Sequence, residues 1–343
     1  MRWFVNKMLF GGKNGQLPYW VASMCRYLMP VCADARHVER LLKEAEGRAD
    51  YEYMRERAEF YCQMDEACAL PDEAHTIGEY RYGKPVRAAQ RYYPEESLAK
   101  TYFFDSNEIL RHFPKHLRWI HLFGDVTRAM EVPTVVKTRP TDCDKRNSVL
   151  LNLDKNRHFT FLHDTVPLRE KKDVLICRCS INGQPQRKRL FREYFNKSWC
   201  DLGEVADVHD DNLPEWRKPK ISLYKHLENK YVACFEGNDV ASNLKWVMSS
   251  GSVAVMCRPT CESWFMESKL VPGYHYIEVR PDLSDLEEKI TYYNAHVEEA
   301  EAIVAHAREY VSQFFDSRRE FLIGVMTMMR YFTMTGQALK NKE

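Results

Sequence analysis

The sequence predicts an α/β fold with two domains and helical segments at both ends. Its 343 residues suffice for two domains of ordinary size, each with its own core. From residue 173 onward strand-like and helix-like segments alternate, which is typical of parallel βαβ units. Residues 35–68 and those after 293 show the three-and-four spacing of apolar side chains that favours amphipathic helices.

Short apolar runs between turn residues occupy 101–164, a pattern that indicates strands. The polar segment 167–172 separates this stretch from the βαβ units. We therefore expect an N-terminal domain over 1–168 and a second domain over 169–315. The remaining residues, 316–343, are expected to form a helix that packs back on the N-terminal domain.

The composition describes a globular chain with little net charge. Hydrophobic residues make up 45% and charged residues 29%, so we expect the chain to be folded throughout. A formal net charge of +1 supplies no field to hold a polyanion, so nucleic acid is not an expected partner. No segment has the apolar length that spans a bilayer or the pattern of a secretory signal. We therefore expect a cytoplasmic protein.

Residues 1–30 are basic and rich in apolar side chains. They contain Arg2, Lys7, Lys13 and Arg26, and the first acidic residue is Asp34. Such a segment can hold a protein on the inner face of the cytoplasmic membrane through apolar contacts and attraction to anionic lipids. A helical cap on the N-terminal domain is an equally good interpretation.

The segment Glu236–Trp246, EGNDVASNLKW, is the clearest candidate site. It follows a predicted strand, and ligands of open parallel sheets gather at the carboxyl ends of strands. Gly237 permits close backbone approach, and the amides of the following helix together with Lys245 could bind a diphosphate. Asp239 could instead cap that helix and compete for the same amides, so a diphosphate would depend on side chains. The alternative is an ordinary capped helix with a solvated Lys245.

Six stretches of the sequence, one of which includes EGNDVASNLKW, form a common pattern. They are FGDV with VPTVVKTRP (123–140), NSVLLNL with RHFTFLHD (147–164), QPQRKRLFREYFN with CDLG (184–203), EGNDVASNLKWVMSSGSVAVM (236–256), ESWFMESKLVPGYHYIEV (262–279) and DLSDLEEKITYYN (282–294). In this order they resemble glycosyltransferase family 90, the CAP10-like proteins, and especially its bacterial lipopolysaccharide glycosyltransferases. The similarity covers most of residues 100–315, and the first hundred residues match only loosely.

The resemblance implies a GT-B-like architecture, in which two Rossmann-like domains face each other across a cleft. It also implies an inverting, metal-independent enzyme that uses a UDP-sugar as co-substrate and no cofactor. Asp125 in FGDV matches the family's general base, which would take the proton of the attacking acceptor hydroxyl. Without the resemblance, the residues favour Asp125 as the cap of a turn after Gly124.

The resemblance also implies which residues bind the donor. Arginine suits a diphosphate because its fork donates two hydrogen bonds. Arg178 and Arg187 match the family's arginines. At the position of Cys179, directly after Arg178, the family commonly has glycine. Glu262 would receive a ribose hydroxyl, although it could equally be an exposed helix acid. The full donor-binding set is Arg178, Arg187, Gly237, Ser242, Asn243, Lys245 and Glu262.

An Asp-x-Asp triplet, Asp142 to Asp144, would hold a divalent metal in GT-A enzymes. Such triplets often arise by chance, and this one lies in a polar turn. We therefore expect no metal site.

Together these features predict transfer of a sugar of the glucose, galactose or xylose type from a UDP-sugar. The expected acceptor is a saccharide or lipid-linked glycan in lipopolysaccharide core or surface glycan synthesis. Two alternatives stay open. One is a protein O-glycosyltransferase, although the eukaryotic relatives of that kind carry entry signals for the secretory pathway. The other is a non-catalytic protein of the same fold that binds a nucleotide sugar or carbohydrate.

Overall fold

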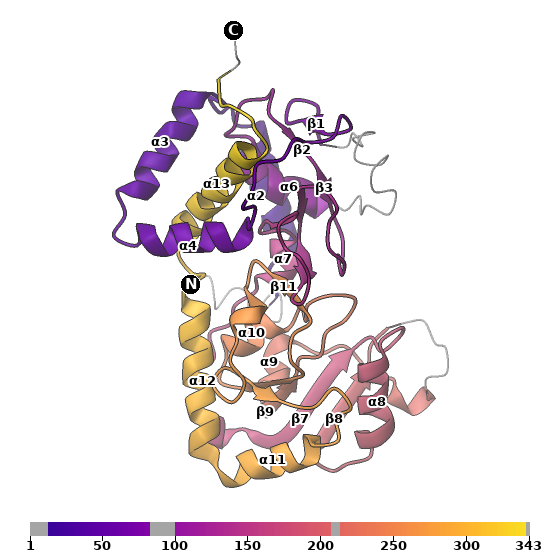
Figure 1. Ribbon diagram of the computed structural model, residues 1–343. Helices are drawn as coiled ribbons and strands as arrows, with labels where there is room; N and C mark the ends of the chain where they lie inside the picture. Colours follow the sequence, from indigo (N-terminus) through magenta and orange to yellow (C-terminus); the bar gives the residue numbers. More distant parts are fainter. Residues whose placement is uncertain (1–12, 83–99, 207–212, 341–343) are drawn as a thin grey trace. The chain divides into compact units, whose positions relative to one another are not determined.

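The computed structural model describes residues 13–82, 100–206 and 213–340 (Figure 1). The chain forms two compact units, each of which we describe by itself. Unit 1 contains Asn156–Pro259, Glu267–Phe315 and the described residues before Gln16; unit 2 contains Gln16–Lys155, Thr260–Met266 and the chain from Asp316 onward. Both are mixed α/β units with parallel strands, as the sequence predicts.

Unit 1 is built on a five-stranded parallel sheet in the order β12-β10-β9-β7-β8. Taking β7 as the first strand along the chain, this is the doubly wound order 2-1-3-4-5. Its switch point lies between β7 and β9, so the loops that follow these two strands lie side by side. The strands are β7 (Lys172–Cys179), β8 (Cys200–Glu204), β9 (Asn229–Ala233), β10 (Val253–Met256) and β12 (Ile277–Glu278).

Every residue of β9 and β10 is buried, so both faces of the sheet are covered there, which explains the apolar runs Tyr231–Ala233 and Val253–Met256. One face forms a core with side chains from α8, α11 and the first half of α12, including Leu190, Ile290 and Ile303. The short helix α10 packs against β10 and α12. The helices of unit 1 are η1 (Leu168–Glu170), α8 (Pro185–Tyr194), η2 (Pro214–Trp216), α9 (Leu223–His226), α10 (Leu244–Met248), η3 (Glu267–Lys269), α11 (Leu286–Ala295) and α12 (Val297–Ser312), and α7 (Lys155–His158) begins at the boundary with unit 2.

Unit 2 contains a three-stranded parallel sheet in the order β3-β4-β6 and two antiparallel pairs, β1-β2 and β5-β11. Its strands are β1 (His75–Thr76), β2 (Arg118–Trp119), β3 (His121–Leu122), β4 (Thr134–Val136), β5 (Thr138–Pro140), β6 (Ser148–Leu150) and β11 (Cys261–Ser263). Because β11 pairs with β5, the segment Thr260–Met266 belongs to unit 2 although its sequence neighbours belong to unit 1. The expected ranges 1–168 and 169–315 include no such exchange.

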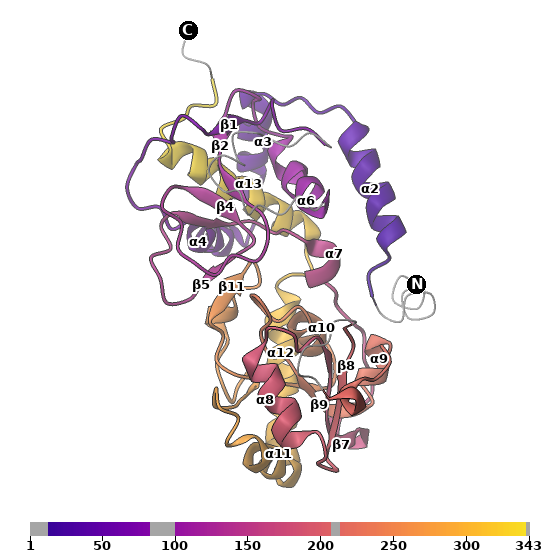
Figure 2. The same ribbon diagram turned by 90° about the vertical axis from the view of Figure 1, so that its right-hand side faces the viewer.

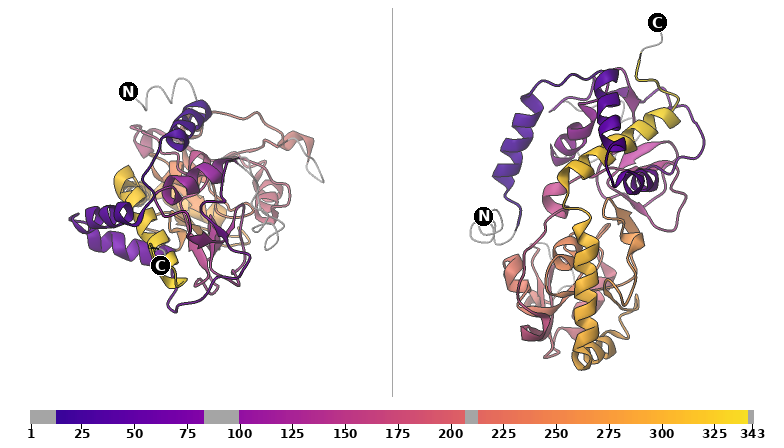
Figure 3. Two further views of the ribbon diagram at one scale, coloured as in Figure 1. Left: turned by 90° about the horizontal axis from the view of Figure 1, so that it is seen from above. Right: turned by 90° about the vertical axis from the view of Figure 1, so that its left-hand side faces the viewer.

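The helices of unit 2 are α2 (Gln16–Leu28), α3 (Ala35–Glu46), α4 (Tyr51–Tyr61), α6 (Lys100–Leu110) and α13 (Ser317–Met334). The last of these packs against α3, α4 and α6 (Figure 3, right). Its start is capped by the Asp316 carboxylate, which accepts hydrogen bonds from two backbone amides of the first turn. A buried ion pair of 2.5 Å joins Glu320 of α13 to Arg57 of α4. None of the helices in the described ranges is long and apolar enough to cross a membrane.

Candidate functional site

Arg187 ties together the two loops at the switch point of unit 1. It lies on α8, directly after the β7 loop, and its guanidinium donates to the carbonyl of Ser180 at 3.0 Å and to that of Phe235 at 2.8 Å. The first carbonyl follows β7 and the second follows β9. A Cβ atom added to Gly237 would lie 3.0 Å from Nη2 of Arg187, so a larger residue there would crowd the guanidinium. The structure thus brings Arg187 and Gly237 together where doubly wound sheets bind ligands.

The EGNDVASNLKW segment forms a longer turn than the sequence suggests. The helix α10 begins at Leu244 rather than directly after Asp239, and its N-cap residue is Asn243. The Asn243 amide donates to the carbonyl of Ala233, the last residue of β9, at 2.8 Å. The alternative in which Asp239 caps this helix was therefore wrong. Ser242 lies beside Asn243 in the turn, and both residues are half-buried.

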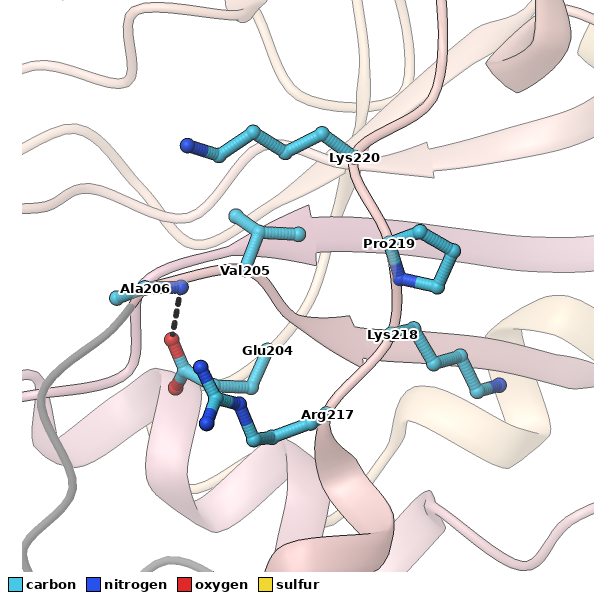
Figure 4. A pocket seen from close by; sticks show the side chains of 7 residues that line it. All are labelled: Glu204, Val205, Ala206, Arg217, Lys218, Pro219 and Lys220. Atoms are coloured by element: carbon cyan, nitrogen blue, oxygen red, sulfur yellow. Dashed lines mark hydrogen bonds between the residues drawn. The ribbon is translucent and has the colours of Figure 1, made fainter.

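A hollow of about 480 Å³ adjoins the carboxyl end of β8 (Figure 4). Glu204, the last residue of β8, accepts a hydrogen bond from the amide of Ile181 in the β7 loop at 3.0 Å and one from Ala206 at 2.9 Å. Figure 4 shows Arg217 pointing toward this carboxylate. The lining residues are Glu204, Val205, Ala206, Arg217, Lys218, Pro219 and Lys220. This hollow was not predicted; its only signal in the sequence is the group of cations at 217–220.

Asp125 is held by the two residues that follow β4, the strand next to β3 in unit 2. It follows β3 through Gly124, whose φ of 122° lies in the region that favours glycine. The ammonium of Lys137 lies 2.6 Å from the Asp125 carboxylate; the Lys137 side chain is 2% exposed and that of Asp125 is 30% exposed. The next residue, Thr138, accepts from the amide of Val126 at 3.2 Å and donates to its carbonyl at 3.1 Å. Because β3 and β4 are parallel, the end of β4 can hold this turn, and the carboxylate still reaches solvent.

Lys137 was not among the predicted site residues, although it lies in the VPTVVKTRP segment. Neighbouring strands in parallel order bring residues 125 and 137 together, and this proximity is invisible without the pairing.

Comparison with known proteins shows the family to which the chain belongs. Residues 167–328 match the family model described as glycosyl transferase family 90. Over 334 residues the chain is 33% identical to the O-glucosyltransferase LpsA of Dichelobacter nodosus, an alignment that covers 96% of each protein. This chain belongs to glycosyltransferase family 90.

The resemblance inferred from the sequence segments is thereby confirmed, and the protein is a glycosyltransferase. The similarity to LpsA extends well beyond residues 100–315. A second relative, Protein O-glucosyltransferase 2 of Danio rerio, is 30% identical over 102 residues, which are 30% of this chain and 20% of that protein. Membership of an enzyme family disfavours the non-catalytic alternative.

In this family 90 enzyme Arg178 faces a different neighbour from Arg187. Its guanidinium donates to both carboxylate oxygens of Asp201 on β8, at 2.8 and 2.9 Å, and to the Asp201 carbonyl at 2.8 Å. Lys218 donates to the same carboxylate at 2.8 Å. Arg178 is therefore engaged with β8, on the other side of β7 from the switch point between β7 and β9. A donor phosphate would compete with Asp201 for its guanidinium.

Lys245 is buried rather than solvated. Its side chain is fully inaccessible, and its ammonium lies 2.5 Å from a carboxylate oxygen of Glu267, which is 2% exposed. The interpretation of a solvated Lys245 was therefore wrong. A buried ammonium needs such a partner because its desolvation is otherwise costly. The contact between Lys245 and Glu267 lies within unit 1 and has a structural role. A phosphate could bind Lys245 only by displacing Glu267.

We expect Lys245→Met to lower the free energy of unfolding by about 3 kcal/mol, because it leaves the Glu267 carboxylate buried without its cation. Urea unfolding measures this. The double variant K245M/E267Q removes both charges and should recover most of the loss. If K245M instead unfolds like the wild-type protein but no longer binds UDP, Lys245 contacts the donor and the structural assignment is wrong.

Glu262 belongs to unit 2, whereas the other expected donor-binding residues belong to unit 1. It is a fully buried residue of β11, so the alternative of an exposed helix acid was wrong. Its carboxylate accepts from Nε of Arg139 on the paired strand β5 at 2.8 Å and lies 3.0 Å from the ammonium of Lys145. A ribose hydroxyl would have to compete with these two cations.

The Asp-x-Asp triplet lies at the surface. Asp144 is bound by the guanidinium of Arg146 at 2.8 Å, and this hydrogen bond lowers the pKa of Asp144 to about 2. Within the part of the chain that the structure describes, no group of three or more His, Cys, Asp or Glu side chains is arranged to hold a metal ion.

Proposed function

We propose that this glycosyltransferase transfers glucose from UDP-glucose to a saccharide acceptor with inversion at the anomeric carbon. The contact that carries the donor half of this proposal is Arg187, whose guanidinium bonds the loops after both β7 and β9. Both relatives are named O-glucosyltransferases, which favours glucose over the galactose and xylose alternatives.

In this proposal Arg187 is the main residue that binds the diphosphate. As the glycosidic bond to the diphosphate breaks, negative charge builds up on the departing phosphate oxygens, and a fixed cation stabilises it. The two carbonyls orient the guanidinium before the donor arrives, so little reorganisation is needed. Gly237, Ser242 and Asn243 line the same β9 loop and would contribute backbone and side-chain hydrogen bonds.

Asp125 is the general base in this proposal. The acceptor oxygen forms a bond to the anomeric carbon while the bond from that carbon to the UDP oxygen breaks, and the acceptor proton passes to the carboxylate. UDP leaves with the electron pair of the broken bond. The exposed part of Asp125 gives an acceptor hydroxyl access, and Lys137 and Thr138 support its position. The GT-B class stays a prediction, which the parallel sheet with helices in each unit supports.

For the acceptor we propose a lipid-linked or lipopolysaccharide-type glycan, following the resemblance to bacterial members of the family. The inner face of the cytoplasmic membrane, where such a glycan is accessible, is then the place of the reaction. The relative that covers 96% of this chain is bacterial, whereas the protein O-glucosyltransferase matches only 30% of it. Because the bacterial relative matches a much larger share of this chain, we favour a saccharide acceptor over a protein.

Release of UDP from UDP-glucose tests the donor and the metal requirement together. We expect turnover to persist in excess chelator, because a guanidinium rather than a metal ion would stabilise the departing diphosphate. UDP-glucose should also raise the melting temperature, since it binds the native state. Complete loss of turnover in chelator, restored by manganese, would contradict the metal-free mechanism and return attention to Asp142 and Asp144. Turnover with UDP-galactose or UDP-xylose alone would contradict the choice of glucose.

A further inference from the structure

The helix α2 presents a continuous apolar face to solvent. Leu17, Val21, Cys25 and Leu28 recur at helical spacing on this face, and Met29 follows directly. Leu17 and Leu28 are each 72% exposed, Val21 is 53% exposed and Met29 is 58% exposed. Single exposed apolar side chains are common, but a row of them along one helix is typical of an interaction site. We call Leu17, Val21, Leu28 and Met29 the α2 stripe.

The opposite face of α2 is anchored, so the stripe cannot turn inward without loss of these contacts. Trp20 packs edge-on against Phe104 of α6 with ring centroids 5.5 Å apart, and Tyr27 packs against Phe103 at 5.4 Å. The Tyr19 hydroxyl donates to the buried carboxylate of Asp105 at 3.0 Å. In unit 2, α2 therefore lies alongside α6 (Figure 2). The side chains of the stripe, on the other face of α2, are exposed.

The sequence that contains α2 is basic, although its residues 1–12 lie outside the described ranges. The sequence up to residue 33 contains Arg2, Lys7, Lys13 and Arg26 and no aspartate or glutamate. Lys13, just before α2, is exposed, and Arg26 within α2 forms an ion pair of 3.1 Å with Glu108 of α6. An apolar helix face within a basic stretch of sequence suits an anionic lipid surface, because the acyl region takes the apolar side chains and the headgroups attract the cations.

A second copy of the chain fits this surface less well. In a symmetric dimer the same patch meets itself, so the basic residues would face one another. One short helix also provides little of the roughly 800 Å² per partner that a stable interface buries.

We propose that α2 docks this enzyme on membranes that contain anionic phospholipid, with the α2 stripe inserted at the boundary between headgroups and acyl chains. The proposal is independent of the donor and of Asp125. It makes α2 the element that would bring a lipid-linked acceptor and the enzyme to one surface.

Flotation of the full chain with lipid vesicles tests this proposal. We expect the protein to float with vesicles of phosphatidylcholine and phosphatidylglycerol, less with phosphatidylcholine alone, and less at high salt. The variant L17Q/V21Q/L28Q should reduce the floated fraction by roughly tenfold or more. A matched triple variant elsewhere, V166Q/L213Q/V271Q, replaces side chains that are 45%, 48% and 50% exposed and should leave flotation unchanged.

Because all six positions are exposed, both variants should melt like the wild-type protein and release UDP from UDP-glucose at the same rate in solution. Equal flotation of the wild-type protein and L17Q/V21Q/L28Q would overturn the proposal. Equal binding to neutral and anionic vesicles would overturn its electrostatic part. Concentration-dependent self-association that L17Q/V21Q/L28Q abolishes, without flotation of the wild-type protein, would assign the stripe to a second copy instead.

Discussion

Replacing Asp125 with asparagine should lower the turnover number by about 10²–10⁴-fold, the usual contribution of a general base. Asparagine has the same shape and can still occupy the turn after Gly124, but its amide cannot take the proton of an acceptor hydroxyl. Steady-state transfer to a saccharide acceptor, with the melting temperature measured in parallel, tests this. A folded D125N protein with unchanged turnover would remove Asp125 as the base.

Lys137 complicates this variant and also supplies its control. Its side chain is 2% exposed, so D125N leaves an ammonium buried beside a neutral amide and should lower stability. The double variant D125N/K137M removes both charges and should recover stability without recovering turnover. If the double variant regains activity, the loss in D125N came from the lysine that had lost its carboxylate and not from the missing base.

Replacing Arg187 with methionine should lower kcat/KM for UDP-glucose by about 10²–10³-fold, as expected when one group that stabilises developing negative charge is removed. The variant also leaves the carbonyls of Ser180 and Phe235 without their donor, so the two loops should lose order together. Arg187→Lys keeps the charge but not the fork and should give an intermediate loss. Titration calorimetry with UDP reports the binding part of the effect.

The matched control lies on the same helix. Arg189 is 47% exposed and pairs with Glu193 one turn away at 2.7 Å, an arrangement that contributes little to stability. Arg189→Met should therefore leave both UDP affinity and turnover unchanged. Should R187M bind UDP as tightly as the wild-type protein and lose only stability, Arg187 would be a connector of the two loops and not a donor ligand.

The parts of the fold that could be predicted are those encoded by neighbours along the chain. Alternating strand-like and helix-like segments predict the parallel sheet of unit 1, because each βαβ unit is formed by residues that are consecutive in the sequence. The helix α10 also follows the alternation predicted for this region, although all five of its residues are buried. Its starting residue does not, because the hydrogen bond from Asn243 to Ala233 that ends the turn depends on where β9 ends.

The burial and partner of a charged side chain depend on residues far away in sequence. Lys245 looks like an exposed helix lysine, yet Glu267 pairs with it across 22 residues. Glu262 looks like a helix acid, yet Arg139 binds it across 123 residues because β11 joins β5. No local pattern distinguishes these residues from solvated ones, since the desolvation that demands a partner appears only once the core has formed.

By itself the sequence determined the enzyme family, the α/β class, and the candidates Asp125 and Arg187, because each depends on the order of residues within short segments. Only the tertiary structure decided that Arg187 joins two loops of one sheet, that Lys137 supports Asp125, and that Lys245 and Glu262 are buried in ion pairs. The physical reason is that strand order and burial bring together side chains that the sequence separates, and the cost of burying charge then selects which of them must pair.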